Sequence, residues 1–252
     1  MLLQFEQVSR TFPEQRAALD HVSFSLHANE FLTIVGPSGC GKSTLLRLAS
    51  GLDQPTSGRI TRDGALGASG SVAFVFQDAN LMPWASVFDN IWLPLRLAGV
   101  SRAQSVARIH SLLDVVGLAD VAMLRPAQLS GGMRMRVSIA RAMVTRPRLL
   151  LMDEPFGSLD DFTRKRLGQD LLRWWRQEKM SVMLVTHQLS EAVLLGQRVI
   201  AMGARPGRII EVIEVPEPAA RDQEFMSSLF FLQTVNRLGD VIEADSRQGS
   251  VR

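Results

Sequence analysis

The stretch GPSGCGKST, residues 36–44, joins two segments with different hydrophobic patterns. Before it, EFLTIVG (30–36) is a short apolar run of the kind that forms a buried strand. After it, KSTLLRLASG (42–51) has helical spacing and reaches Gly51, a common residue at the end of a helix. The glycines between them leave the backbone bare where the chain turns. The stretch therefore predicts a strand–loop–helix unit, the building block of α/β proteins.

The same stretch matches the pattern G-x-x-x-x-G-K-[ST] of phosphate-binding loops. We expect backbone N–H groups from Ser38 to Ser43 to surround a β-phosphate at the helix N-terminus, where orphan donors and the helix dipole favour an anion. Lys42 would reach the β- and γ-phosphates, and the Ser43 hydroxyl would coordinate Mg²⁺. The alternative is a simple Gly-rich turn. The candidate residues of this cradle are Gly36, Ser38, Gly39, Cys40, Gly41, Lys42, Ser43 and Thr44.

A second apolar run, RLLLMDEP (148–155), ends in two adjacent acids. An acid at the carboxyl end of a buried strand beside a phosphate-binding loop can hold Mg²⁺ through water. Asp153 would then serve the metal, and Glu154 would act as the general base on the attacking water. The alternative is a pair of acids that caps the end of a strand.

The rest of the chain predicts alternating strands and helices. Residues 1–30 favour antiparallel strands, and MSVMLVTH (180–187) favours another buried parallel strand. Residues 78–142 are mainly helical in pattern, and Ser101 can cap a helix there. One face of that helix carries Val106, Ile109, Leu112, Leu113 and Val116. Further predictions are a helix at 162–178, a hairpin that turns at RPG (205–207) and a helix near Glu224–Leu238.

Composition limits the classes of protein to consider. The chain has 252 residues, 46% of them apolar, and a net charge of +3. No uncharged run of 18 residues occurs and the N-terminus lacks a secretion pattern, so we expect neither a membrane span nor a signal peptide. The single Cys40 excludes an internal disulfide. The single cysteine and the lack of a span or signal lead us to expect a cytoplasmic location. Arginines are scattered among the acids, so we expect no nucleic-acid partner.

Further motifs then appear in a recognisable order: FQ (76–77), LSGGM (129–133), PFGSLD (155–160) and VTH (185–187). With the cradle and the acid pair, they make residues 3–215 resemble the nucleotide-binding subunit of ABC transporters. The resemblance implies a P-loop NTPase (RecA-like) core with an antiparallel β margin, and ATP and Mg²⁺ as cofactors. It also implies a cassette at 1–215 with a helical subdomain at about 78–142, followed by a tail at 216–252.

The resemblance assigns roles that the residues alone do not. Gln77 would contact Mg²⁺ and water, His187 would contact the γ-phosphate, and Asp160 would meet an opposing subunit. Taken in isolation, Gln77 or His187 would more often be an ordinary polar residue at the end of a strand.

LSGGM resembles the ABC signature. In that family two subunits meet head to tail, so Ser130, Gly131 and Gly132 would present N–H donors to the ATP held by the other copy. Bare backbone lets a helix N-terminus approach a phosphate closely. The alternative is a serine N-cap followed by a glycine hinge.

The chain also departs from the family pattern. The family usually stacks a tyrosine on adenine, but this chain contains no tyrosine, and Phe12 stands at the matching place. Phe12 could instead be an ordinary core aromatic. Met133, Met135 and Gln188 replace residues that are common in the family. None of these changes removes a group that touches phosphate, so we expect hydrolysis to survive.

NLMPWASVFDNI (80–91) and MGARPGRIIEVIEV (202–215) most closely resemble importers of nitrate, aliphatic sulfonates and taurine, and importers of thiamine-precursor pyrimidines look similar. The resemblance implies a second copy of the chain, membrane permease subunits and a solute-binding protein as partners. It places the subunit peripherally on the cytoplasmic face of a bacterial inner membrane.

The segment around Pro83 and Trp84 resembles the surface that docks the permease. The alternative is a loop that packs over its own helical subdomain. For the whole chain, the alternatives are a soluble ABC ATPase acting on ribosomes or DNA, and a nucleotide-gated regulatory module.

Overall fold

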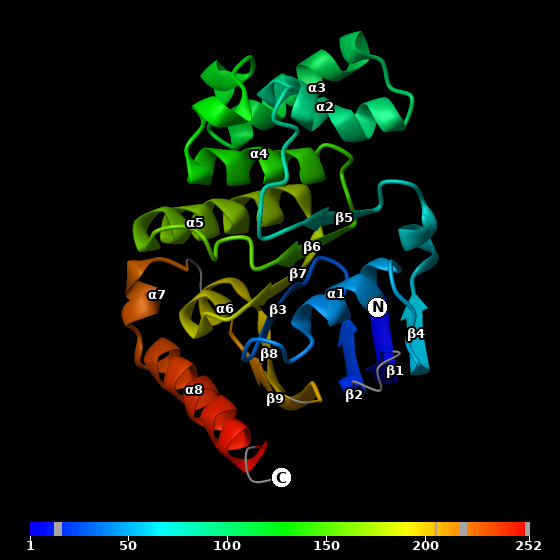
Figure 1. Cartoon of the computed structure of the whole chain (residues 1–252). Coiled ribbons are helices and arrows are strands. Elements are labelled where there is room, and N and C mark those ends of the chain that lie inside the picture. Colours follow the sequence, from blue (N-terminus) through cyan, green and yellow to red (C-terminus); the bar gives the residue numbers. More distant parts are fainter. Residues whose placement is uncertain (13–16, 205, 217–220, 250–252) are drawn as a thin grey trace. The chain divides into compact units, whose positions relative to one another are not determined.

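The computed structural model describes residues 1–12, 17–204, 206–216 and 221–249 (Figure 1). The chain divides into two compact units. Unit 1 comprises Met1–Gly64 and Ser181–Arg252, and unit 2 comprises Ala65–Met180. The candidate cradle and His187 belong to unit 1, whereas the acid pair and LSGGM belong to unit 2.

Unit 1 contains the expected antiparallel margin. Strands β1 (Leu3–Thr11), β2 (Ala17–Leu26) and β4 (Ser57–Arg62) form a sheet in the order β2-β1-β4, and both pairings are antiparallel. Phe5 and Phe24 stack across the β1–β2 pair with ring centroids 4.6 Å apart. Cross-strand aromatic pairs of this kind fix the register of a sheet.

The parallel strands of unit 1 carry the cradle. Strand β3 (Phe31–Val35) lies between β7 (Ser181–Thr186) and β8 (Arg198–Gly203), parallel to both. Every residue of β3 and β7 is buried, as their apolar sequences predict. Helices α1 (Lys42–Ser50) and α6 (Leu189–Leu195) follow β3 and β7. The predicted strand–loop–helix unit is confirmed, and α1 stops at Gly51 in the left-handed conformation.

The predicted hairpin and the C-terminal helix are also present. Strand β9 (Arg208–Glu214) pairs antiparallel with β8, although Arg205 of the expected turn lies outside the described residues. The expected helix near 224–238 is two helices, α7 (Gln223–Ser227) and α8 (Leu229–Gly249). Ser228 separates them with an extended backbone, and its hydroxyl accepts a hydrogen bond from Phe231 N. Residues 217–220 and 250–252 of the expected tail lie outside the described residues.

Unit 2 combines two parallel strands with a group of helices. Strand β5 (Val72–Val75) pairs with β6 (Leu149–Asp153). The helices are α2 (Val87–Leu97), α3 (Arg102–Val115), α4 (Gly131–Met143) and α5 (Asp161–Glu178). Helix α4 packs against α2, α5 and β5, and it therefore ties the helical part of the unit to its strands.

The predicted apolar face of α3 is wrong at one position. Ile109, Leu112 and Leu113 are buried, but Val106 is 41% exposed. Ser105 is buried instead, and its hydroxyl donates to Ser101 O at 2.9 Å. A serine can occupy this inner position because its hydroxyl is satisfied within the helix. The predicted cap is confirmed, since Ser101 forms a complete capping box.

Candidate functional site

The loop between β3 and α1 requires glycine at two positions. A Cβ on Gly36 would lie 2.6 Å from Met202 O. Gly41 has φ of +92°, and a Cβ there would lie 2.7 Å from Ala18 O. Both sites therefore exclude a side chain, because the loop packs closely against neighbouring backbone at these two positions.

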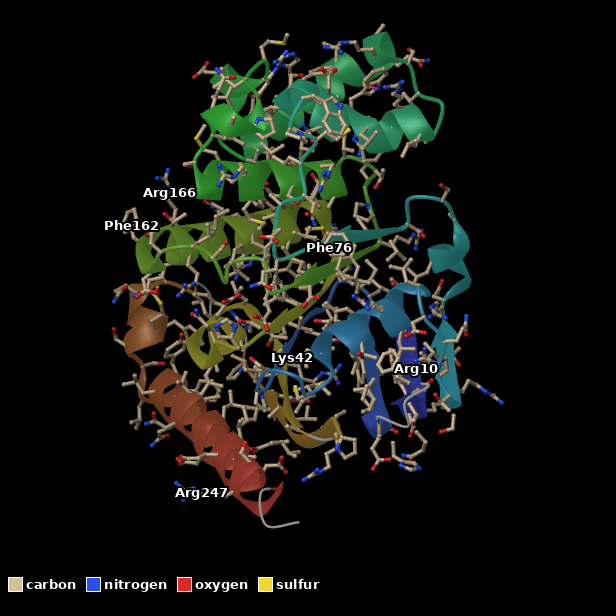
Figure 2. All side chains as sticks on the ribbon, viewed as in Figure 1. Arg10, Lys42, Phe76, Phe162, Arg166 and Arg247 are labelled. Atoms are coloured by element: carbon tan, nitrogen blue, oxygen red, sulfur yellow. The ribbon has the colours of Figure 1, made fainter. Side chains whose placement is uncertain are left out.

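The N-terminus of α1 is suited to an anion. Its N-cap is Gly41, which supplies no side-chain oxygen, and its first turn contains no acid. The Lys42 side chain is buried, and its Nζ donates to Gly36 O at 2.9 Å and to Pro37 O at 3.1 Å. The ammonium is thereby held by two carbonyls of the loop that precedes the helix. Figure 2 labels Lys42 next to α1. Positive charge and a helix N-terminus together favour phosphate at this place.

The other residues of the cradle differ in what they offer. Ser38 and Ser43 are exposed and Thr44 is half-buried. Cys40 is fully buried, with its Sγ near the position that a Cβ on Gly36 would take. The side chain of Cys40 therefore belongs to the packing, and only its backbone faces the loop.

His187 emerges at the same sheet edge as Gly36. The parallel register pairs Val35 with Thr186, so the next residue of each strand is Gly36 on one and His187 on the other. His187 is exposed, whereas Thr186 is buried. The carboxyl edge of the parallel strands is where α/β proteins bind ligands.

Phe12 lies at the end of β1 and is half-buried, so it is not one of the buried core aromatics. The Arg10 guanidinium lies over its ring, with Cζ 5.0 Å from the centroid. Arg10 also pairs with Asp53 at 2.8 Å. The arrangement of Arg10 over the Phe12 ring is a cation–π contact.

In unit 2, the acids and Gln77 also share one edge. Strands β5 and β6 are in parallel register with Val75 opposite Met152, and Gln77 and Glu154 each lie two residues further along their own strands. Asp153 and Glu154 are half-buried and Gln77 is exposed. Glu154 has φ of +45°, which is uncommon for a residue with a Cβ. Strained backbone of this kind often occurs at functional sites.

The LSGGM segment forms the start of α4. Ser130 is its N-cap, and the hydroxyl accepts a hydrogen bond from Met133 N at 3.2 Å. Ser130 and Gly131 are exposed. A Cβ on Gly132 would lie 2.8 Å from Thr163 Cγ2, so this glycine allows α4 to approach α5. The serine N-cap that the alternative interpretation expected is therefore present. Ser130 and Gly131 are at the same time accessible from solvent.

Asp160 has a local role that the sequence analysis did not include. It is the N-cap of α5, and its Oδ1 accepts a hydrogen bond from Thr163 N at 2.9 Å. The pKa of Asp160 lies below its usual value. The main cause is the hydrogen bond from the backbone N–H of Thr163, and a hydrogen bond from the Thr163 side chain adds to it.

Two arginines of α4 were missed by the sequence analysis. Arg141 donates from Nη1 to Asn80 O and from Nη2 to Ala79 O, both at 2.8 Å, and its burial lowers its pKa. Arg136 pairs with Asp170 of α5. The groups that these arginines contact are distant from them in the sequence. The only feature of the sequence that pointed to the arginines is their place on the helix that follows LSGGM.

The Asn90 side chain fixes the loop that precedes α2 through hydrogen bonds to its backbone. Its Nδ2 donates to Ser86 O at 2.9 Å, and its Oδ1 accepts from Met82 N at 2.8 Å. Asn90 is fully buried, whereas Trp84 is 73% exposed. Pro83 is also exposed. The side chain of Trp84 therefore does not pack over unit 2.

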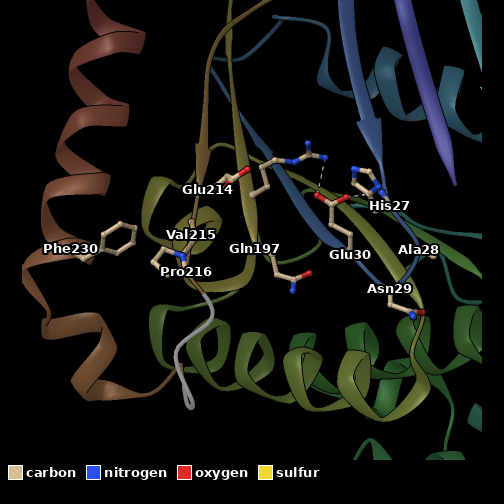
Figure 3. Close-up of a pocket in the computed structure, with 10 residues that line it drawn as sticks. His27, Ala28, Asn29, Glu30, Gln197, Glu214, Val215, Pro216 and Phe230 are labelled. Atoms are coloured by element: carbon tan, nitrogen blue, oxygen red, sulfur yellow. Dashed lines mark hydrogen bonds and ion pairs between the residues drawn. The ribbon is translucent and has the colours of Figure 1, made fainter. Parts of the chain in front are cut away.

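A cavity of about 690 Å³ in unit 1 contains none of the candidate residues (Figure 3). It lies at the start of β3, whereas the cradle follows the other end of that strand. Glu30 and Arg198 form an ion pair of 2.8 Å within it, and Glu214 adds a second carboxylate. Two carboxylates and one guanidinium do not suit a triphosphate.

None of the helices in the described part of the chain is long and apolar enough to cross a membrane.

Comparisons with known proteins agree with the geometry. The family model for the ABC transporter matches residues 19–157. The nitrate import ATP-binding protein NrtD of Synechococcus elongatus is 42% identical over 230 residues, which cover 88% of this chain and 84% of that protein. The taurine import ATP-binding protein TauB of Sinorhizobium fredii is 40% identical over 228 residues, which cover 87% of this chain and 85% of that protein.

A solved structure gives the same result for the fold. The ATP-binding cassette MJ0796, in a dimeric post-hydrolysis state bound to ADP and phosphate, superposes with a TM-score of 0.74 at 30% identity. The match covers 86% of this chain and 100% of that one. The chain therefore belongs to the ABC transporter family, as an ATP-binding subunit with ATPase activity.

Proposed function

We propose that this chain is the ATP-hydrolysing subunit of an importer for small anionic or zwitterionic solutes such as nitrate, sulfonates or taurine. ATP binding and hydrolysis in a head-to-tail dimer would drive uptake through a separate membrane permease supplied by a solute-binding protein. The subunit would lie on the cytoplasmic face of the membrane. Residues 1–215 would form the cassette and residues 216–252 a tail. The names of the nitrate and taurine import relatives support the importer branch.

The observation that carries the proposal is the cradle at the start of α1. Glycine is required at Gly36 and Gly41, and Lys42 is held over the loop by two carbonyls. These features would bind the β- and γ-phosphates of ATP, with Phe12 stacked on the adenine. The N–H groups of residues 38–44 would orient the chain of phosphates.

The residues proposed for Mg²⁺ fit that ion chemically. Ser43, Gln77 and Asp153 offer a hydroxyl, an amide oxygen and a carboxylate, which are the hard oxygen ligands that Mg²⁺ prefers. Bound Mg²⁺ would supply charge neutralisation at the phosphates.

Hydrolysis would depend on two further side chains. Glu154 would accept a proton from the attacking water, and His187 would donate a hydrogen bond to the γ-phosphate. The exposure of His187 and the half-exposure of Glu154 support these roles, because each side chain is accessible to a ligand at the carboxyl edge of its own strands.

The second copy would supply the other half of the site. Ser130 and Gly131 are exposed at the start of α4, and their N–H groups would bind the γ-phosphate of ATP held by the partner subunit. Asp160 would meet the partner from the start of α5. Exposed Trp84, on a loop fixed by Asn90, would dock the permease.

Reconstitution tests the importer proposal. The chain is purified with the permease and solute-binding protein encoded beside it and placed in liposomes. ATP is supplied in the compartment that the ATP-binding subunit faces. We expect nitrate, taurine or an aliphatic sulfonate to raise ATP turnover and to accumulate in that same compartment. Lys42→Ala should lower both the turnover and the uptake about 10- to 150-fold. Steady turnover that no solute changes, with no uptake, would refute coupling to import.

A further inference from the structure

The C-terminal tail contributes one buried arginine to the body of unit 1. Arg221 is only 6% exposed. Its Nη1 donates to Val193 O at 3.2 Å, to Leu194 O at 2.8 Å and to Gly196 O at 2.7 Å. A guanidinium shared among carbonyls in this way stabilises a defined position of the backbone that carries them.

These carbonyls belong to the C-terminal end of α6, where the last turn of a helix leaves acceptors without intrahelical donors. A cation at this end also interacts favourably with the helix dipole. Helix α6 has seven residues, so its last turn makes up about half of its length.

The other end of α6 is fixed next to His187. Thr186 Oγ1 donates to Glu191 Oε2 at 3.2 Å and accepts from Gln188 N at 3.0 Å. Thr186 and Glu191 are both buried. His187 therefore lies between the end of β7 and the start of a helix that is held at both ends.

The tail surrounds Arg221 with packed groups. Arg221 Cζ lies 5.7 Å from the centroid of the Phe225 ring. The rings of Phe225 and Phe231 pack edge to face, with their centroids 5.5 Å apart. Helix α8 packs against α6, with Leu189 Cδ1 3.4 Å from where a Cβ of Gly239 would lie. The arginine thus joins the tail to α6, and α8 of the tail packs against the same helix (Figure 1).

We propose that Arg221 is a positioning residue for His187, acting through α6, and that the tail 221–249 thereby sets the rate of ATP hydrolysis. This inference rests on the proposed role of His187 at the γ-phosphate. Arg221 lies at the opposite end of α6 from His187, and its loss displaces the helix that follows His187.

Three variants of the full-length chain test this proposal. Arg221→Ala removes the contact, and Arg221→Lys keeps a cation that can donate to the same carbonyls. Arg237→Ala is the matched control, because Arg237 lies on the same tail, is 69% exposed and pairs with Glu211 of β9. We expect Arg221→Ala to lower kcat about tenfold with KM for ATP changed less than about twofold, in the range of coupling between neighbouring residues. Arg221→Lys should recover most of the loss, and Arg237→Ala should match the wild type.

A double-variant cycle separates positioning from general destabilisation. The residual turnover of His187→Ala is measured with radiolabelled ATP, alone and combined with Arg221→Ala. If Arg221 acts through His187, the combined variant loses no more than His187→Ala alone. Hydrogen exchange provides a readout without nucleotide. Arg221→Ala should speed exchange in the peptide 188–197 and leave the peptide of α1 unchanged.

Each outcome decides the proposal. Full turnover in His187→Ala would reject the proposed role of His187, and this inference with it. Loss in His187→Ala together with a multiplied loss in the combined variant would reject the inference alone. Unchanged kcat in Arg221→Ala would also overturn it, as would a uniform rise in exchange over α1 and α6, which indicates general loosening.

Discussion

A mixture of two inactive variants tests whether the signature acts on the nucleotide of the partner subunit. Lys42→Ala removes an ammonium that donates to Gly36 O and Pro37 O and is proposed to reach the phosphates. A hydrogen bond to a charged group contributes about 1.5–3 kcal/mol, which corresponds to about 10- to 150-fold in turnover. Ser130→Arg puts a long side chain at an exposed cap where backbone must approach an anion.

The expected recovery follows from counting sites. In an equal mixture, about half of the dimers contain one copy of each variant, and each such dimer has one intact site out of two. The intact site joins Lys42 of one chain to Ser130 of the other. Turnover should therefore rise to about one quarter of the wild-type value if the sites act independently.

The reciprocal mixture provides the control. The wild type is mixed with a chain that carries both changes, which gives heterodimers without an intact site if the site is shared. Turnover then comes from wild-type dimers alone, at about one quarter, whereas a site built within one chain would give about one half. Phosphate release is measured after exchange between differently labelled subunits has been demonstrated. A covalently linked dimer of wild type and Lys42→Ala establishes turnover with one intact site.

Thermal melting monitors the folding of each variant, because Ser130→Arg also removes the cap on Met133 N, which contributes about 1 kcal/mol. With exchange demonstrated and one-site turnover established, no recovery in the first mixture at any ratio would refute the shared site. No recovery in the first mixture, together with about one half of the wild-type turnover in the reciprocal mixture, would show that LSGGM serves its own chain.

Three further predictions concern single residues. Phe12→Ala should weaken ATP binding by about 1–3 kcal/mol if the ring stacks on adenine, whereas Phe12→Tyr should leave the affinity nearly unchanged. Calorimetry measures both affinities, and an unchanged affinity of a folded Phe12→Ala would return Phe12 to a packing role. Glu154→Gln keeps the shape and removes the base, so turnover should fall about 10²–10⁴-fold while ATP drives dimerisation on size exclusion; a monomer in saturating ATP would count against the paired site. Because the folded pKa of Asp160 is depressed, its contribution to stability is present above the unfolded pKa and lost as pH falls through the folded one. Asp160→Asn should therefore flatten the acid side of the melting-temperature profile, and identical profiles would contradict that role of the cap.

The cradle could be predicted because its chemistry is local. The glycines and Lys42 lie within one short stretch, and the flanking strand and helix follow from short-range patterns. The two apolar runs also predict buried parallel strands, but the register that brings Val35 beside Thr186 is seen only in the structure. The acid pair was located in the same way, at the end of an apolar run.

The missed features depend on contacts between distant residues. Arg141 reaches carbonyls about 60 positions away and Arg221 reaches others that are more than 20 positions away, and neither pattern is visible in a window of sequence. The error at Val106 has a different origin. Hydrophobicity alone placed valine inside, but the capped turn buries Ser105, whose hydroxyl is satisfied there.

The close approach of Gly132 to Thr163 has a mechanical consequence. The first turns of α4 and α5 touch where any side chain on Gly132 would collide, and Asp160 caps the second of these turns. The two loops proposed to face the partner therefore lead into helix turns that touch each other. In the proposed dimer, a displacement of the start of α4 on nucleotide binding would move Asp160, which is proposed to contact the neighbouring chain. Loss of nucleotide from one site would then change the other site without any change in the phosphate cradle.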